Sequence, residues 1–193
     1  MELEIIPLSP ESGPEFCAFF DHLDYSYKPD WRGCYCQFYH STCDEAGWQA
    51  RSPGQNRADA LARIARGEMR GYLAYADGEC VGWCNANALA ALPRFAGSPE
   101  LAQFDDKTGV VICFVIRPDF RGRCAARQLI RAAVEGFRRE GFARVLGLPF
   151  EWKEHPELQY HGTRAMFADA GFSRVNTDAQ RPLMVLDLSE EKS

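Results

Sequence analysis

The sequence lacks the features that mark membrane-bound, secreted or nucleic-acid-binding proteins. It contains no run of about 18 apolar residues, so we expect no membrane span and no membrane partner. Its first residues, MELEIIPLSPESG, are acidic and do not show the basic-then-apolar pattern of a signal peptide, so we expect a cytoplasmic protein. The net charge of -5 at pH 7 has the wrong sign for a general nucleic-acid binder, and we expect no nucleic-acid partner.

The chain also lacks internal repeats, low-complexity segments and the two commonest phosphate-binding motifs. A chain of 193 residues without such divisions suits a single domain over residues 1–193. The absence of Gly-Lys-Ser/Thr excludes a Walker loop, and the absence of G-x-G-x-x-G excludes a Rossmann fingerprint. A phosphate site in this chain would therefore need another kind of turn.

Cysteine, by contrast, is plentiful, with eight residues. In the cytoplasm these are expected as free thiols, metal ligands or small buried residues and not as disulfides. Cys34, Cys36, His40 and Cys43 are soft ligands in a short span, which leaves a metal or thiol sensor as an alternative function. Because C-x-C is not the usual C-x2-C spacing and no second ligand pair follows, we expect no bound metal. A Cys nucleophile with His40 as its base is a further alternative.

Hydrophobic periodicity and turn residues predict a mixed α/β sandwich with a mostly antiparallel sheet. Ser52 and Pro53 open a clear amphipathic helix, and Asp-Gly at 77–78 separates two strands of a hairpin. The run GVVICFVI, residues 109–116, is apolar and β-branched, as in a central strand covered on both faces. The expected order of elements is β, α, α, β, β, β, α, β, α, β, with an irregular stretch over 25–50.

An arginine-rich turn follows the central strand. Pro118 cannot donate a ladder hydrogen bond, so strand pairing should stop before it. A helix then begins, and its first amides and its dipole favour an anion such as a pyrophosphate. Arg121, Arg123 and Arg127 add positive charge at the same point. The alternative is a solvated, basic start of a helix.

This turn, VIRPDFRGRCAARQL, resembles the signature of the GCN5-related N-acetyltransferases: a strand ending V-x-P, an aromatic residue, then R-G-x-G-x-G/A opening a helix. Cys124 stands where the family usually has its second glycine. A negative φ would make Cys124 tolerable there, whereas a positive φ would strain it. The late segment GTRAMFADAGF, at 162–172, also looks like the family's late helix with its closing Gly-Phe. The matching residues of the turn are Ile116, Pro118, Phe120, Arg121, Gly122 and Ala126.

The resemblance implies a fold, a reaction and a cosubstrate. It implies a mixed, mostly antiparallel twisted sheet flanked by helices, with a splayed central strand pair. It implies direct transfer of an acetyl group from acetyl-CoA to a primary amine of a small molecule or peptide, and similar enzymes are frequently homodimers. Backbone groups of Phe114, Val115 and Ile116 would pair with the pantetheine arm. The pyrophosphate would be held by Gly122, Arg123, Cys124, Ala125, Ala126 and Arg127, with Arg121 beside them.

The residues for proton transfer depart from the family pattern. Many related enzymes carry a tyrosine as proton donor four residues before the glycine of Gly-Phe, and this chain has Phe167 there. A non-catalytic CoA-binding or regulatory domain is therefore an alternative function. Tyr160, with His161 beside it, is our candidate general acid, although it could instead pack the helix start. Candidate bases near strand ends are Asp105, Asp106 and Glu151.

By its position in such a fold, the segment 25–50 is expected as a lid over the acceptor side. Strand alternation further places Trp83, Asn85 and Asn87 on one face, where the asparagines could bind a polar acceptor. Ordinary core packing is the alternative for the lid aromatics. The predicted acceptor-pocket residues are Trp31, Cys34, Tyr35, Cys36, Trp83, Asn85 and Asn87.

Overall fold

The computed structural model describes residues 2–26, 28–150, 160–178 and 181–188. Their strands form one mixed sheet of seven strands in the order β1-β2-β3-β4-β5-β7-β6. All neighbouring pairs are antiparallel except β4 and β5, which run parallel. The predicted fold class is confirmed. The strands are β1 (Glu4–Pro7), β2 (Gly71–Ala76), β3 (Glu79–Ala88), β4 (Thr108–Ile116), β5 (Arg144–Gly147), β6 (Ser173–Arg174) and β7 (Met184–Asp187).

Local sequence signals mark the start of α3 and the end of α4. Ser52 and Gln55 form a reciprocal capping box at the start of α3, and Gly141 follows α4 with a φ of 76°. The Asp77–Gly78 turn closes the β2–β3 hairpin with both residues at positive φ, the geometry of a type I′ turn. The α-helices are α1 (Gly13–His22), α2 (Glu45–Gln49), α3 (Pro53–Ala65), α4 (Ala125–Arg139) and α5 (Arg164–Asp169).

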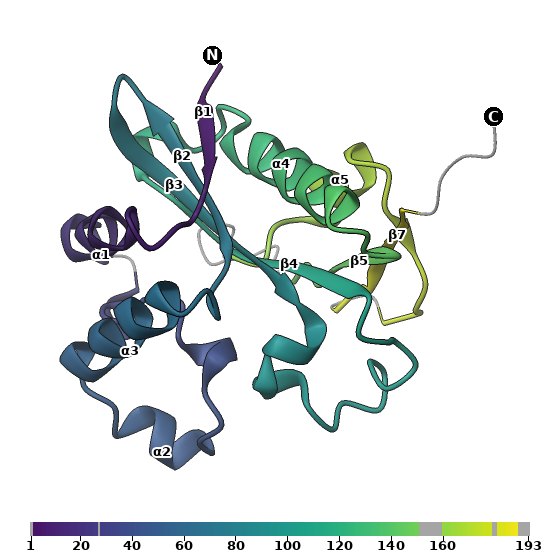
Figure 1. Cartoon of the computed structure of the whole chain (residues 1–193). Helices are drawn as coiled ribbons and strands as arrows, with labels where there is room; N and C mark the ends of the chain where they lie inside the picture. Colours follow the sequence, from purple (N-terminus) through teal and green to yellow (C-terminus); the bar gives the residue numbers. More distant parts are fainter. Residues whose placement is uncertain (1, 27, 151–159, 179–180, 189–193) are drawn as a thin grey trace.

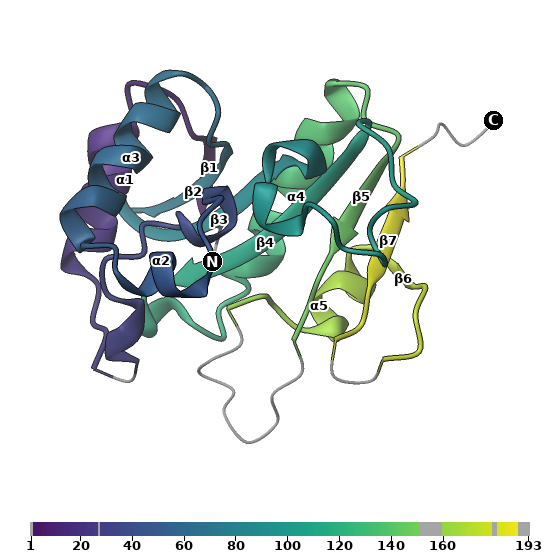
Figure 2. The same cartoon turned by 90° about the horizontal axis from the view of Figure 1, so that it is seen from below.

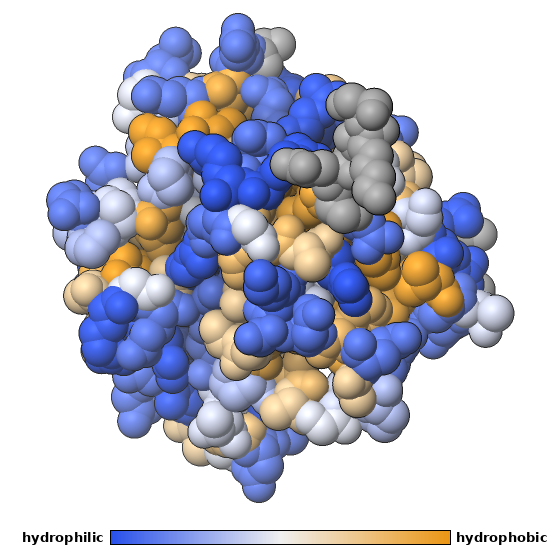
Figure 3. Space-filling model, turned by 45° about the vertical axis from the view of Figure 1, so that its right-hand side comes forward, coloured by the Kyte–Doolittle hydropathy of each residue, from blue (hydrophilic) through white to orange (hydrophobic). Residues whose placement is uncertain are grey.

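Two layers of helices cover the sheet. Apolar residues of α1 and α3 share a core with one face, around the fully buried Trp83. Residues of α4 and α5 share a second core with the opposite face. The two helical groups are separate in Figure 1. Hydrophilic side chains cover most of the face shown in Figure 3, with small hydrophobic areas between them. The central strand β4 is therefore covered on both sides, as its apolar run predicts.

The sequence did not predict every element. The stretch 25–50, expected to be irregular, contains α2 and two short 3-10 helices, at Pro29–Trp31 and Phe38–His40. The short strand β6 was also missed. In the part of the chain that the structure describes, none of the helices combines the length and the apolar character needed to cross a membrane.

The central strand β4 extends beyond its parallel partner β5. The parallel ladder joins β4 to β5 only from Thr108 to Val111, and β4 then continues alone to Ile116. Figure 2 shows the two strands together at one end and diverging toward the other. This splay leaves one edge of β4 without a strand partner in the middle of the sheet.

Candidate functional site

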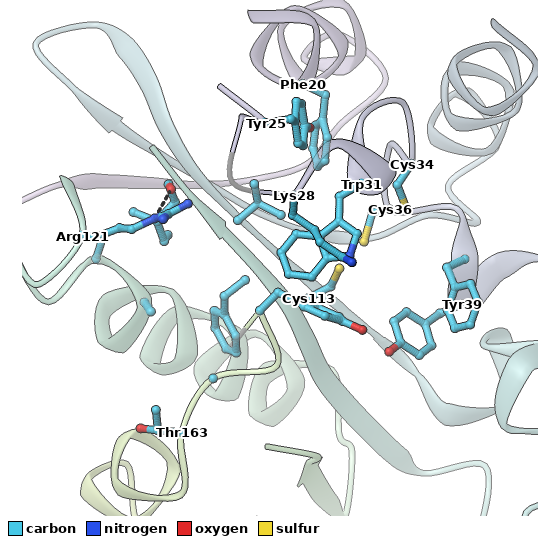
Figure 4. Close-up of a pocket in the computed structure, with 18 of the residues that line it drawn as sticks. Phe20, Tyr25, Lys28, Trp31, Cys34, Cys36, Tyr39, Cys113, Arg121 and Thr163 are labelled. Carbon is cyan, nitrogen blue, oxygen red and sulfur yellow. Dashed lines mark hydrogen bonds between the residues drawn. The ribbon is translucent and has the colours of Figure 1, made fainter. Parts of the chain in front are cut away.

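A cavity of about 830 Å³ opens where β4 and β5 diverge. It is lined by the segment 25–50, by β4 from Cys113 onward, by the turn that opens α4 and by residues just before α5. Figure 4 shows Cys36, Cys113 and Tyr39 toward one end and Arg121 at the other. The cavity thus joins the basic turn to the aromatic and cysteine-rich segment.

A β-bulge in β4 shapes the middle of this cavity. Trp83 of β3 pairs with Val115, but Asn85 pairs with Ile112, so β4 carries one extra residue there. Cys113 lies in the bulge with a φ of 61°, in the left-handed region. The bulge turns β4 away from β5 and creates the gap.

Hydrogen-bond alternation decides which backbone groups of β4 face the gap. The amide of Arg117 donates to the carbonyl of Val81, which makes these two a hydrogen-bonded pair. In an antiparallel ladder such pairs alternate, so Val115 also faces β3, whereas Ile116 faces the gap. The backbone groups of Val115 therefore face β3, although the residue lines the cavity, and its pairing with a ligand in the gap stays a prediction.

Two backbone groups at the gap already have partners within the chain. The amide of Phe114 donates to the carbonyl of Tyr160 at 2.5 Å. Nε of Arg121 donates to the carbonyl of Ile116 at 3.2 Å, as the dashed line in Figure 4 shows. Phe114 and Ile116 therefore line the gap, and the Phe114 amide fixes Tyr160 beside the bulge.

The turn before α4 combines two left-handed residues. Gly122 has a φ of 71° and Cys124, the residue before the helix, has a φ of 63°. The glycine adopts this conformation at little cost, but the cysteine does so under strain. The sequence left the φ of Cys124 open, and the structure selects the strained alternative.

Most of the predicted turn residues face the cavity. Arg127 is held by an ion pair with Asp169 at 2.7 Å. Arg123 is not among the described lining residues, because its guanidinium lies over the ring of Phe120, 5.5 Å from the centroid. The lining residues of this turn are Arg121, Gly122, Cys124, Ala125, Ala126 and Arg127.

Tyr160 lies in the cavity wall, where the sequence placed a candidate proton donor. Its ring packs edge-on against Trp31, with centroids 4.7 Å apart. Burial raises the pKa of Tyr160 to about 12, so the hydroxyl keeps its proton at neutral pH. A hydrogen bond also joins the hydroxyls of Tyr160 and Tyr39. The side chain can therefore donate a proton into the cavity.

Tyr39 and His161 form a pair that the sequence did not predict. The hydroxyl of Tyr39 lies 2.5 Å from Nε2 of His161, and Nδ1 of His161 lies 2.8 Å from the carbonyl oxygen of Leu148. Burial lowers the pKa of His161 to about 4, so the ring is neutral at pH 7. Only the adjacency of Tyr160 and His161 hinted at this site, because the pairing depends on the tertiary fold.

Phe167 takes no part in the cavity. Its side chain is 0% exposed and packs on Phe114 and Phe172, with centroids 6.1 and 5.1 Å away. A Cβ at Gly147 would approach its ring to 2.4 Å, so this ring also requires a glycine at the end of β5. Phe167 is a core residue here.

The predicted acceptor-pocket residues divide into two groups. Trp31, Cys34 and Cys36 line the cavity, whereas Tyr35, Trp83, Asn85 and Asn87 are not among its described lining residues. The hydroxyl of Tyr35 donates to Asp21, and Trp83 packs edge-on against Phe16. Nδ2 of Asn85 contacts Nε2 of His40 and Sγ of Cys36, and Nδ2 of Asn87 donates to the Glu68 carbonyl. Interior packing was the alternative to a pocket role, and the contacts of these four residues are of that kind.

The cysteine-rich stretch is held by other contacts than a shared metal. Sγ of Cys43 contacts Oγ of Ser41 at 2.7 Å, and Nε2 of His40 accepts from Asn85. Among the described residues, no group of three or more His, Cys, Asp and Glu side chains is arranged to hold a metal ion. Nε2 of His40 is directed at the amide of Asn85 and not at a thiol.

Cys36 and Cys113 are nonetheless neighbours in the cavity wall. Their thiols share a hydrogen bond, and Figure 4 shows both sulfur atoms beside one another. The bond to Cys36 and burial raise the pKa of Cys113. Burial also raises the pKa of Cys36, but hydrogen bonds from Cys113 and Asn85 outweigh it and lower that pKa overall. The cavity wall therefore carries two ionisable thiols at the bulge.

None of the predicted carboxylate bases lies in the described wall of the cavity. Oδ1 of Asp105 accepts from Lys107 and Thr108 and so closes the turn before β4. Asp106 is exposed, and Glu151 lies outside the described residues. Glu45 of α2, which the sequence did not single out, does line the cavity.

Comparisons with known proteins agree with this geometry. An acetyltransferase of the GNAT family from Streptococcus pneumoniae superimposes with a TM-score of 0.56 at 15% identity, over 96% of this chain and 99% of that one. The PaiA N-acetyltransferase of Thermoplasma acidophilum, solved with coenzyme A, gives 0.55 at 13% identity over 97% and 99%. YncA of Salmonella typhimurium, solved with acetyl-CoA, gives 0.54 at 13% identity over 100% and 98%.

The structural likenesses, all at low identity, show the fold. No curated protein matches the chain in sequence. The family model described as "Acetyltransferase (GNAT) family" matches residues 26–172, well over half of the chain and including the bulge, the basic turn and α5. The chain therefore belongs to the GNAT acetyltransferase family.

Proposed function

We propose that the protein transfers an acetyl group from acetyl-CoA directly to a primary amine of a small molecule or peptide. The observation that carries the proposal is one continuous cavity that connects the basic turn of α4, through the gap beside β4, to Tyr160 and the segment 25–50. Acetyl-CoA would supply the activated acetyl thioester. In this arrangement the segment 25–50 acts as the lid over the acceptor.

The residues present fit such a cosubstrate. Amides at the start of α4 and the side chains of Arg121 and Arg127 would bind the pyrophosphate. The edge of β4 near Phe114 and Ile116 has no strand partner, and its backbone groups other than the Phe114 amide, which already donates to Tyr160, would bind the pantetheine arm by strand-like hydrogen bonds. The bulge at Cys113 would then lie beside the thioester.

The proton transfers would fall to the tyrosines of the cavity. Tyr160 holds a proton at neutral pH and would give it to the departing thiolate. The attacking amine must lose a proton, and the hydroxyl of Tyr39, which lines the cavity and donates to Nε2 of the neutral His161 ring, would relay it toward that ring. Because this chain has a hydroxyl at Tyr160, the apolar Phe167 does not by itself favour a non-catalytic domain.

Two measurements test the proposal. Calorimetric titration with acetyl-CoA should show binding, and release of free thiol should accelerate when a primary amine is added. Binding without any amine-dependent thiol release would favour the non-catalytic CoA-binding alternative. Absence of binding at millimolar acetyl-CoA would contradict both.

A further inference from the structure

The end of the cavity beyond the bulge is walled by aromatic rings. Trp31, Tyr39 and Trp48 of the segment 25–50 line it, together with Tyr160. Ring contacts hold these walls in place: Trp31 packs on Tyr160, and Tyr39 stacks on Phe95 with centroids 5.2 Å apart. The acceptor would therefore meet fixed, flat and largely apolar surfaces.

Trp48 belongs to the same wall but comes from the separate helix α2. Its ring lies edge-on to Phe38, with centroids 5.2 Å apart, and Arg94 covers the Phe38 ring at 4.2 Å. Phe38, which also lines the cavity, is thus held between Trp48 and Arg94. The far end of the cavity is consequently braced by contacts within the lid and with the loop at Arg94.

The charges in the cavity wall disfavour a polycationic acceptor. Among the described lining residues, Glu45 is the only carboxylate, and its side chain is 68% exposed. That carboxylate already accepts from Arg94 at 3.0 Å. Three basic side chains, those of Lys28, Arg121 and Arg127, also line the cavity. A polyamine or an aminoglycoside would need several carboxylates, which the described wall does not offer.

We infer that the acceptor is an aromatic monoamine, with one primary amino group on a short alkyl chain attached to an aromatic ring. The inference rests on the proposed function and deepens it. The ring would pack against Trp31 and Trp48 in edge or stacked contacts. The amino group, still charged on entry, would be favoured by the faces of the same rings and then reach Tyr160 and Cys113. A single cation needs no cluster of carboxylates.

The test is amine binding to the protein saturated with CoA, which does not require turnover. Calorimetry would compare 2-phenylethylamine with 2-cyclohexylethylamine, a saturated ring of similar size, and with spermidine. We expect 2-phenylethylamine to bind roughly tenfold more tightly than spermidine and several-fold more tightly than the saturated amine. Equal or tighter binding of spermidine, or no detectable binding of 2-phenylethylamine at millimolar concentration, would overturn the inference.

Variants locate the binding to this wall. Trp48→Leu and Trp31→Leu should each weaken 2-phenylethylamine binding roughly tenfold and leave CoA affinity unchanged. The matched control is Phe142→Leu, which removes a ring packed on Phe137 in the opposite core. It should leave amine affinity unchanged. Normal affinity in both tryptophan variants would contradict the inference.

Thiol release with acetyl-CoA separates this inference from the function on which it rests. Binding of 2-phenylethylamine without its acetylation would support the aromatic site and contradict the transferase. Faster acetylation of spermidine than of 2-phenylethylamine would support the transferase and overturn the aromatic site.

Discussion

The hydroxyl of Tyr39 donates a hydrogen bond to Nε2 of His161, 2.5 Å away and 122 positions later in the sequence. The direction of this bond follows from the other ring nitrogen. Nδ1 of His161 faces the carbonyl oxygen of Leu148, which can only accept, so Nδ1 carries the proton and Nε2 accepts. The hydroxyl of Tyr160 also interacts with that of Tyr39, and this contact raises the pKa of Tyr39 and lowers that of Tyr160. Tyr39 therefore contacts both His161 and Tyr160.

Tyr39→Phe should remove the contacts of this hydroxyl with His161 and Tyr160. We expect kcat for acetyl transfer to fall on the order of 10²-fold, because general acid–base assistance is lost, with CoA affinity unchanged. Thiol-release kinetics and calorimetry would measure the two effects. Tyr35→Phe is the matched control, since Tyr35 belongs to the same segment but donates to Asp21 away from the cavity. Equal losses of kcat in the two variants would contradict a catalytic role for the Tyr39 hydroxyl.

Much of the frame was predictable because it depends on local chemistry. The cap at Ser52, the hairpin turn at Asp77–Gly78 and the apolar run of β4 each specify structure within a few residues. The basic turn was predictable for the same reason.

The acceptor end was not predictable to the same degree. Strand alternation placed Trp83 and Asn85 on one face correctly, but it could not tell that α1 and the lid would bury that face. The left-handed φ of Cys124 and the contact between Tyr39 and His161 both depend on tertiary packing. Sequence patterns report periodicity within an element, whereas these features join distant elements.

His40 should make the stability of the fold depend on pH. Burial lowers its pKa to about 4, and Nε2 accepts from the amide of Asn85. Protonation would put an N–H donor on Nε2, facing the N–H donor of the Asn85 amide, and neither would have an acceptor. An unfolded chain binds this proton at about pH 6.5, so stability is full above that pH and falls as the pH decreases toward about 4.

Replacing His40 by Gln should flatten this dependence. The slope contributed by His40 is at most roughly 1.4 kcal/mol per pH unit, and urea unfolding at about pH 7 and about pH 5 would measure it. His22→Gln, at an exposed helix end, should leave the slope as it is. An unchanged slope in the His40 variant would show that the histidine is not buried in its neutral form.

Cys124→Gly should relieve strain in the turn. A left-handed φ costs a non-glycine residue about 1–2 kcal/mol, and the flexibility of glycine in the unfolded chain offsets part of that gain. We therefore expect the free energy of unfolding to rise by up to about 1 kcal/mol, with CoA affinity equal or better. Cys124→Ala removes the thiol and keeps the strain, so it separates the two effects. A large loss of CoA affinity in the glycine variant would mean that the thiol itself contributes to binding.

Arg127→Gln should weaken CoA binding by roughly tenfold, because a charge-assisted contact to phosphate is lost. Its guanidinium lines the cavity and is positioned by Asp169. The loss should shrink for a pantetheine fragment without the pyrophosphate, which calorimetry can compare directly. Arg138→Gln, near the other end of α4, should bind both ligands normally. Equal weakening for CoA and for the pantetheine fragment would show that Arg127 does not bind the phosphates.

Tyr160→Phe tests the proton donor where this chain differs from the pattern of related enzymes. Phe167 cannot substitute for it, because its ring is fully buried between Phe114 and Phe172. Loss of the Tyr160 hydroxyl should lower kcat on the order of 10²-fold and leave the affinities for CoA and amine nearly unchanged, since Trp31 still packs on the ring. A more acidic thiol is a better leaving group and needs less help from a proton donor. The loss of kcat should therefore be smaller with an acetyl thioester of such a thiol. A defect of equal size for both thioesters would mean that Tyr160 positions the substrates and does not protonate the leaving group.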